Sequence, residues 1–254
     1  MAKIAAQLYT LRDTLSTPAE IADTLKKVRE IGYEAVQISG IKAEIAPAEL
    51  KKICDDNGLT VCATHCGMAN LTERIDQLIE DHKIYDCAYT ALASIPGDRR
   101  DFEGYKQTAK DLTEAGKKLA DNGITLCYHN HAFELQKYDD GRTGLAILYE
   151  DSDPQFLQGE IDTYWIAYGG GEPTAWCKRL VGRLPLVHFK DMTIVDNQHQ
   201  MTEIGEGNLN WKDICLACKE AGTRWYIVEQ DVCQRDPLES LKISLENMKQ
   251  MPIG

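Results

Sequence analysis

Short runs of apolar and β-branched residues alternate along the chain with longer segments whose apolar residues recur at helical spacing. This alternation is typical of β/α units, in which each strand is followed by a helix. The sequence contains eight strand candidates, at residues 3–10, 33–39, 59–66, 87–95, 124–131, 156–162, 184–191 and 225–232.

The segments between these runs carry helix start and stop signals. In TPAEIADTLKKVREIG, Thr17 is placed to cap a helix, Pro18 stands in its first turn, and Glu20 completes a capping box. Gly32 then ends the helix just before the next strand. The stretches APAELKKICDDNG, DFEGYKQTAKDLTEAGKKLADNG and NWKDICLACKEAG end in glycine in the same way. The sequence therefore predicts helices joined to the following strands by short loops.

Eight β/α units over 254 residues match the size of a (β/α)8 TIM barrel. We therefore expect an α/β fold in which residues 1–254 form a single TIM-barrel domain. The rival is a doubly wound open sheet, which would carry a glycine-rich fingerprint after its first strand. The sequence there is QLYTLRD, without glycine, and the later YGGGEP (168–173) lacks the required spacing.

Composition and charge restrict the classes of partner. The chain is 43% hydrophobic and 27% charged, which suits a globular protein with a sizeable core. Its net charge of −12 disfavours nucleic acid, because the phosphate backbone would be repelled. The start, MAKIAAQLYTLRD, has no hydrophobic signal core, and no stretch approaches the roughly 18 apolar residues of a membrane span. We therefore expect a cytoplasmic protein without nucleic-acid or membrane partners.

The nine cysteines are scattered, mostly in apolar runs, as expected of small buried side chains. The one CxxC, Cys215 to Cys218, lies within a helical pattern. A lone pair of this kind is weak support for zinc, so we expect these two side chains to pack in the core.

The candidate chemistry lies at the carboxyl ends of the predicted strands, where a TIM barrel carries its active site. Several carboxylates and imidazoles converging there would suit Mn²⁺, Mg²⁺, Co²⁺ or Zn²⁺. Without a cation the carboxylates would repel one another and raise their own pKa values. The polar residues at these ends are Gln7, Gln37, His65, His129, His131, Glu134, Asp162, His188, Lys190, Asp191 and Glu229.

Each of these residues also has a purely structural explanation. His188 could be a hydrogen-bonded core histidine, Asp162 a helix cap, and Glu134 a solvated side chain. Lys190 could be a rim lysine whose stem packs while its charge reaches water. Glu229 is harder to explain in this way, because a buried carboxylate directly after an apolar strand is costly unless it is paired or bound to metal. The convergence of such groups on one end of a barrel favours a metal site.

Four segments carry a resemblance to a known family: CYHNHAFEL, GEIDTYW with VHFKDM, EIGEGNLNW and WYIVEQD. They resemble the xylose-isomerase-like superfamily of TIM barrels, nearest to its sugar phosphate isomerases/epimerases, with the inosose dehydratase and hydroxypyruvate isomerase branches close by. The resemblance implies one divalent cation, Mn²⁺ first, with Zn²⁺, Mg²⁺ or Co²⁺ as alternatives. It implies a Glu, an Asp, a His and a second Glu as ligands, here assigned to Glu134, Asp162, His188 and Glu229. Many relatives place the first glutamate on the fifth strand itself, so His129 stays as the alternative to Glu134.

The resemblance also implies a carbohydrate isomerase or epimerase that acts through a cis-enediolate. Glu134 and Glu229 would exchange the roles of base and acid, with His129 or His131 as the base if Glu134 binds the ion. Lys190 would stabilise the developing oxyanion. The residues expected to contact the sugar are His65, Gln37, His131 and Trp165, although Trp165 is equally explicable as a core aromatic.

The main alternative activity is a metal-dependent lyase or dehydratase acting on an inosose or a 3-keto-glycoside, which the two histidines of YHNH favour. An apurinic endonuclease would need more histidines and a basic groove, and a non-catalytic sugar-binding barrel would not need the ligand set. Whether the sugar is phosphorylated stays open, with GDRRD (97–101) as the only candidate phosphate cluster. Relatives often pair, so a homodimer is expected.

Overall fold

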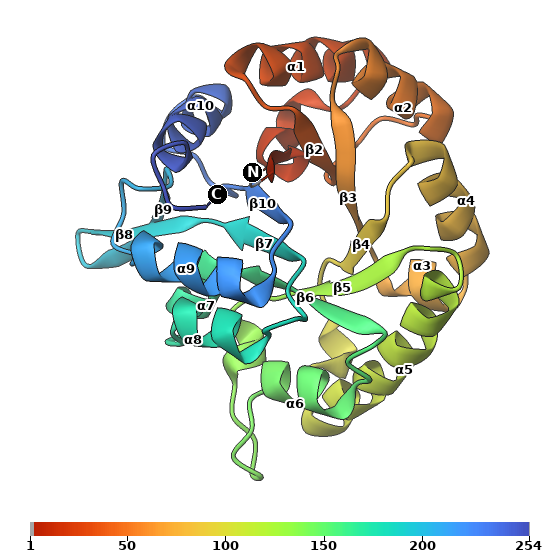
Figure 1. The fold of residues 1–254 in the computed structure, drawn as a ribbon, viewed down its shortest axis with the longest axis vertical. Helices are drawn as coiled ribbons and strands as arrows, with labels where there is room; N and C mark the ends of the chain where they lie inside the picture. The colour runs from red at the N-terminus through yellow and green to blue at the C-terminus, as the bar shows by residue number, and fades with distance from the viewer. Residues whose placement is uncertain (1–2, 254) are drawn as a thin grey trace.

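A closed barrel of eight parallel strands forms the centre of the molecule. The computed structural model describes residues 3–253, and its strands run in the order β1-β10-β7-β6-β5-β4-β3-β2. Figure 1 shows the helices surrounding them. The (β/α)8 prediction is confirmed, and the open doubly wound sheet is excluded because β1 pairs with both β2 and β10. The barrel strands are β1 (Lys3–Gln7), β2 (Ala35–Ile38), β3 (Thr60–Cys66), β4 (Tyr89–Leu92), β5 (Thr125–His129), β6 (Leu157–Asp162), β7 (Leu186–Phe189) and β10 (Trp225–Val228).

Helices are present at all four stretches whose start and stop signals the sequence analysis identified. In α1, Thr17 accepts the backbone N–H of Glu20, the Glu20 side chain completes the capping box, and Gly32 takes a left-handed conformation with φ of 116°. Gly222 ends α9 in the same conformation. The helices are α1 (Pro18–Ile31), α2 (Pro47–Asp56), α3 (Met68–Thr72), α4 (Ile75–Tyr85), α5 (Phe102–Ala120), α6 (Gly144–Asp151), α7 (Thr163–Tyr168), α8 (Pro173–Arg179), α9 (Trp211–Ala221) and α10 (Pro237–Met248).

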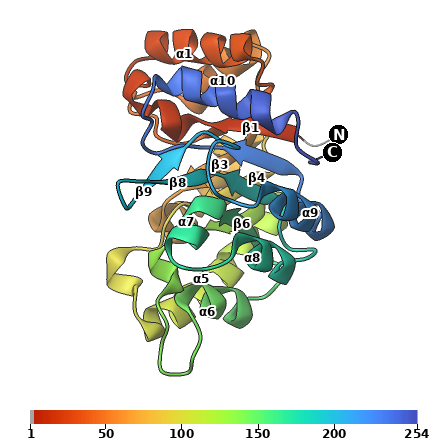
Figure 2. The ribbon, with the colours of Figure 1, turned by 90° about the vertical axis from the view of Figure 1, so that its left-hand side faces the viewer.

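A β-hairpin that the sequence analysis did not predict follows β7. It pairs β8 (Asp191–Val195) with β9 (Gln198–Thr202), and its two turn residues, Asp196 and Asn197, have φ of 48° and 64°. Positive φ at both positions is typical of the tight turns that match strand twist. In Figure 2 the hairpin lies at the end of the barrel opposite the chain termini.

Asp191 anchors the segment that follows this hairpin. Its carboxylate accepts hydrogen bonds from the backbone N–H groups of Gly205 and Gly207 and from Trp211 Nε1. A Cβ on Gly207 would overlap that carboxylate, so only glycine fits there. Asp191 therefore holds a loop in place at the barrel rim.

The barrel interior consists of layers in which side-chain size and polarity change along each strand. One layer is mostly small and apolar, and it includes Ala5, Ala35, Cys127, Leu186 and Ile227. Successive inward-facing positions of a strand are two residues apart. The next inward position is polar on the same strands or directly after them, at Gln7, Gln37, His129, His188 and Glu229.

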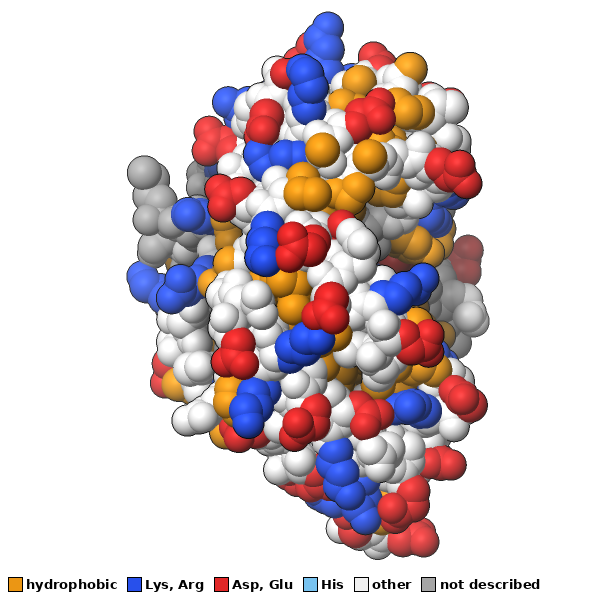
Figure 3. Space-filling view, turned by 90° about the vertical axis from the view of Figure 1, so that its right-hand side faces the viewer, with side chains coloured by type: hydrophobic (Ala, Val, Ile, Leu, Met, Phe, Trp, Pro, Cys, Tyr) orange, Lys and Arg blue, Asp and Glu red, His pale blue; other side chains and the backbone are white. Residues whose placement is uncertain are grey.

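The two ends of the described chain lie side by side in Figures 1 and 2. The first strand, β1, pairs with the last, β10, and α10 follows β10. On the face in Figure 3, acidic side chains are interspersed with basic ones. No helix within residues 3–253 has the length and apolar character needed to cross a membrane. Cys215 and Cys218 are buried in α9, with Cys218 Sγ 3.6 Å from Cys177 Sγ, in agreement with the expected packing role.

Candidate metal centre

Four buried side chains meet at the carboxyl end of the barrel. They are His129 from β5, Asp162 from β6, His188 from β7 and Glu229 directly after β10. One nitrogen or oxygen of each lies within 4.8 Å of those of the other three. His188 Nδ1 is 2.8 Å from Glu229 Oε2, and His129 Nε2 is 3.3 Å from Asp162 Oδ2. We call these four residues the His–Asp–His–Glu cluster.

The imidazole of His129 is oriented by the backbone. Its Nδ1 lies 3.1 Å from the Ala93 carbonyl oxygen, which can only accept a hydrogen bond. Nδ1 therefore carries the proton, and Nε2 faces the cluster. An N–H held by a backbone carbonyl in this way leaves the other nitrogen free to bind metal.

Asp162 combines two roles that the sequence analysis treated as alternatives. Its Oδ1 accepts the backbone N–H of Trp165 at 2.9 Å and so caps α7. Its Oδ2 faces His129 and Lys190 within the site. Capping fixes the carboxylate so that the second oxygen points into the cluster.

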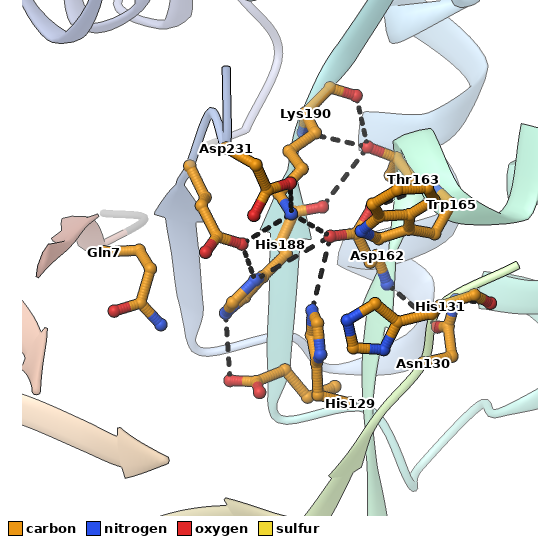
Figure 4. A network of polar contacts seen from close by, with 12 residues as sticks. Gln7, His129, Asn130, His131, Asp162, Thr163, Trp165, His188, Lys190 and Asp231 are labelled. Carbon is orange, nitrogen blue, oxygen red and sulfur yellow. Dashed lines mark hydrogen bonds and ion pairs between the residues drawn. The ribbon is translucent and has the colours of Figure 1, made fainter. Parts of the chain in front are cut away.

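Lys190 lies among the carboxylates of the site (Figure 4). Its Nζ is 2.7 Å from both Glu229 Oε2 and Asp231 Oδ2, and 3.0 Å from Asp162 Oδ2. Burial acts to lower the pKa of Lys190, but these carboxylates raise it well above its usual range. Burial acts to raise the pKa of Glu229, but Lys190 and His188 hold it well below its usual range. Both groups are therefore charged.

A second polar network lies next to the cluster, around Glu160 of β6. Glu160 Oε2 is 2.7 Å from His65 Nε2, and Oε1 accepts a hydrogen bond from Gln37 Nε2 at 2.7 Å. His188 belongs to both groups, since its Nε2 is 2.7 Å from Gln37 Oε1. Burial acts to lower the pKa of His188, but Glu160 and Glu229 raise it to about 10.

His131 and Trp165 stand beside the cluster with unused polar atoms. Their rings lie 5.6 Å apart, and His131 also meets His129 edge-on at 4.9 Å. His131 Nδ1 and Trp165 Nε1 are buried, and neither has a hydrogen-bond partner among the described residues. Burial, then His129 and Lys190, lower the pKa of His131 to about 3, so its ring is neutral at physiological pH. Unpaired buried donors and acceptors of this kind are costly unless a ligand satisfies them.

The donor set of the His–Asp–His–Glu cluster fits a divalent cation. It offers two imidazole nitrogens and two ionised carboxylates, a mixture that Mn²⁺, Co²⁺ and Zn²⁺ accept. The side chains converge from four different strands, and a buried cluster of this composition needs positive charge to offset its carboxylates.

The match to a protein family covers most of the chain. Residues 25–251 match the family described as xylose isomerase-like TIM barrel. The chain belongs to this family.

Relatives of this xylose isomerase-like barrel have several activities in their names. The rhizopine catabolism protein MocC of Rhizobium meliloti is 26% identical, over 92% of this chain and 82% of its own length. An inosose dehydratase of Mesomycoplasma hyopneumoniae is also 26% identical, over 58% of this chain and 54% of its own. The chain therefore spans about half the length of that dehydratase.

Solved structures share the fold at lower identity. A sugar phosphate isomerase/epimerase from Parabacteroides distasonis superposes with a TM-score of 0.80 at 21% identity, covering 99% of this chain and 95% of that one. An L-ribulose 3-epimerase superposes with a TM-score of 0.76 at 16% identity, covering 98% and 94%. Proteins similar to this barrel in sequence or in fold thus carry isomerase, epimerase and dehydratase names.

Three of the four residues that the sequence analysis assigned as ligands meet in the cluster, and Glu134 does not. Its Oε1 accepts the hydroxyl of Tyr128 at 2.7 Å, and its Oε2 accepts the backbone N–H of His131 at 2.9 Å. Among the described residues, the fourth member of the cluster is His129, which the sequence analysis kept as the alternative to Glu134. In this arrangement Glu134 shapes the loop that presents His131.

The other predicted residues divide into two groups. His131, Trp165 and Lys190 stand beside the cluster, whereas His65 and Gln37 belong to the Glu160 network. The candidate phosphate cluster has partners within the chain, since Arg99 pairs with Asp111 and Arg100 donates to the Ile95 carbonyl.

Sequence reasoning missed Glu160 and Asp231. The signal for Glu160 was the alternation of β6, LQGEID, in which Glu160 lies two residues before Asp162 and faces the same side. Asp231 lies two residues after Glu229 within the strand candidate 225–232, so the same alternation could have found it, although β10 itself ends at Val228.

Proposed function

We propose that this protein is a divalent-metal-dependent carbohydrate isomerase or epimerase. The observation that carries the proposal is the His–Asp–His–Glu cluster. Beside it stand buried Lys190 and His131 Nδ1, which makes no hydrogen bond within the described chain. The proposed ligands are His129, Asp162, His188 and Glu229, and the proposed ion is Mn²⁺, with Zn²⁺, Co²⁺ or Mg²⁺ as alternatives. Isomerase and epimerase names among the structural neighbours agree with this proposal.

A divalent ion held here would polarise a sugar carbonyl and the neighbouring hydroxyl, and would acidify the C–H between them. His131 is placed to take and return the proton, because it is neutral and its Nδ1 makes no hydrogen bond within the described chain, with Glu134 Oε1 4.0 Å away. Lys190 is placed to hydrogen-bond the oxygen on which negative charge develops. Return of the proton to the former carbonyl carbon, with the hydroxyl proton moving from one oxygen to the other, gives isomerisation. Epimerisation would need a second group to donate a proton to the opposite face of the same carbon.

Trp165 gives the proposed substrate a flat wall and a hydrogen-bond donor. Its indole lies between His131 and Tyr168, with Lys190 Nζ 5.7 Å from its ring centre. The apolar face of a sugar ring packs well on such a surface, and the buried Nε1–H would donate to a hydroxyl.

A lyase or dehydratase is the second candidate, and two observations favour it. The relatives include inosose dehydratases, and His131 stands next to a second imidazole, His129. The first step would be the same proton abstraction. Departure of a hydroxide or alkoxide from the next carbon would then replace the return of the proton.

Exchange of substrate hydrogen with D₂O tests the shared step. We expect the metal-supplemented protein to incorporate deuterium next to the carbonyl of a ketose, keto-glycoside or inosose, measured by NMR. Isomeric products would identify an isomerase or epimerase, and unsaturated products a dehydratase. Replacing His131 with Asn should slow exchange about 10²- to 10⁴-fold because the proton acceptor is lost. Absence of exchange across free and phosphorylated substrates would contradict the proposal.

A further inference from the structure

The Glu160 network contains two glutamines whose amide orientations are fixed by their neighbours. Gln7 Oε1 accepts the backbone N–H of Tyr9 at 3.3 Å. The NH₂ group of Gln7 must therefore point the other way, and it donates to Gln37 Oε1 at 2.7 Å. Gln37 is fully buried, so its own amide must be satisfied inside the protein.

The contacts of Glu160 agree with this orientation of Gln37. Glu160 Oε2 faces His65 Nε2 at 2.7 Å, and its Oε1 faces the Gln37 amide, whose oxygen already accepts from Gln7. Gln37 Nε2 donates to Glu160 Oε1 at 2.7 Å. The carbonyl oxygen of Gln37 is thereby directed at His188 Nε2, 2.7 Å away.

The chain of contacts ends at the proposed metal ligand His188. An amide oxygen cannot donate, so His188 Nε2 must carry a proton. Nδ1, which lies 2.8 Å from Glu229 Oε2 and 3.9 Å from Asp162 Oδ2, is then the nitrogen that can offer a lone pair once a metal ion displaces its proton. We propose that Gln37, held by Gln7 and Glu160, is a positioning residue that selects Nδ1 of His188 as the metal-binding nitrogen.

This inference rests on the proposed metal centre and gives Gln37 a role other than the sugar contact expected from the sequence. The same geometry explains why a second group of metal-binding residue types lies here, namely His65, Glu160 and His188. The facing atoms of these three residues are joined by hydrogen bonds to one another or to Gln37. That group thus supports His188 and needs no second ion. Partners of this kind orient the imidazole ligands of metal sites.

Zinc titration of matched variants tests the proposal. Replacing Gln37 with Met keeps the bulk of the side chain and removes the acceptor, and should weaken Zn²⁺ binding about 10- to 100-fold by calorimetry. The control is Gln230→Met, a glutamine that is also buried near this end of the barrel but donates to the Val232 carbonyl. Its Zn²⁺ affinity should equal that of the wild type.

The ¹⁵N spectrum of histidine-labelled, Zn²⁺-loaded wild type gives a second readout that needs no variant. His188 should show a protonated Nε2 and a metal-bound Nδ1. The reverse pattern, or equal Zn²⁺ affinity in Gln37→Met and wild type, would overturn the role of Gln37 while leaving the metal centre intact. A wild type that binds no Zn²⁺ would overturn the metal centre and the role of Gln37 together.

Discussion

Lys190 offsets much of the negative charge at the mouth of the barrel. Its side chain is 2% exposed, and its Nζ lies within 3.0 Å of oxygens from Asp162, Glu229 and Asp231. A buried carboxylate that loses its partner cation is strongly destabilising. An ion bound to the cluster would supply a second source of positive charge.

Replacing Lys190 with Met should therefore lower the free energy of unfolding of the chelator-treated protein by about 3–5 kcal/mol. Adding Mn²⁺ should restore part of this loss, because the ion binds the folded state only. Urea denaturation with EDTA and with Mn²⁺ measures both effects. Wild-type stability of the variant in EDTA would show that Lys190 does not balance these carboxylates.

His82 offers a titration remote from the candidate site. It is buried on α4, with Nε2 2.8 Å from Thr64 Oγ1 and Nδ1 2.8 Å from the Cys87 carbonyl oxygen. Burial lowers its pKa below 6.5, more than the contact with Cys87 raises it. The folded state therefore holds His82 neutral at pH values where the unfolded chain binds a proton.

The sign of the pH effect follows from this difference. The contribution of His82 is complete above about pH 6.5 and falls as the pH drops below that value, because protons then bind preferentially to the unfolded chain. Urea denaturation of the chelator-treated protein should show a smaller loss of stability on acidification for His82→Gln than for the wild type. An equal loss of stability on acidification in the two proteins would contradict a neutral His82. Some pH dependence of stability should persist in His82→Gln, since burial also lowers the pKa of His65 and His131.

Individual ligand types could be predicted from the sequence because strand ends are recognisable. Asp162, His188 and Glu229 each follow or end an apolar run, and the structure brings them together. The choice between Glu134 and His129 could not be made, because it depends on how the chain turns after β5. The short helix at Phe133–Leu135 places Glu134 against Tyr128 instead.

At the scale of elements, helix ends could be predicted where the signal lies within a few neighbouring residues. The capping box of α1 and the left-handed glycines after α1 and α9 involve only neighbours in sequence, and they appear where predicted. The β8–β9 hairpin was missed because it continues almost directly from β7 and because its turn, Asp196–Asn197, lacks the glycine that usually marks such turns.

Asp191 links this hairpin to α9, and its removal tests the link. The carboxylate accepts five hydrogen bonds, from the backbone of Met192, Gly205, Gly207 and Leu209 and from Trp211 Nε1. Asp191→Ala should cost about 3 kcal/mol of stability, because five donors lose their acceptor together, among them the buried Trp211 Nε1.

Hydrogen exchange, which reports amide protection, and urea denaturation, which reports the free energy of unfolding, test this prediction. Amides in residues 203–211 should lose protection in Asp191→Ala, while those of the barrel strands keep it. The control Asp139→Ala, at an exposed loop position, should change stability by less than about 0.5 kcal/mol. Unchanged protection of the 203–211 segment would show that Asp191 does not anchor it.

At the scale of the whole molecule, the barrel could be predicted from the count and spacing of its β/α units. The pairings inside it could not be predicted, since Gln37 meets Glu160 across 123 residues of sequence and His188 meets Gln37 across 151. These contacts depend on barrel closure and strand stagger, which no local pattern encodes. Closure also gathers the cluster from four strands, so the proposed function belongs to the folded molecule as a whole.

Metal content of the purified protein, by elemental analysis after incubation with Mn²⁺ or Zn²⁺, tests the proposed centre most directly. Wild type and Glu134→Gln should each retain about one divalent ion per chain, and His129→Ala should bind the ion at least about 10-fold more weakly. Loss of metal in Glu134→Gln with retention in His129→Ala would move the site to Glu134. A folded wild type that retains no divalent ion would contradict the metal centre.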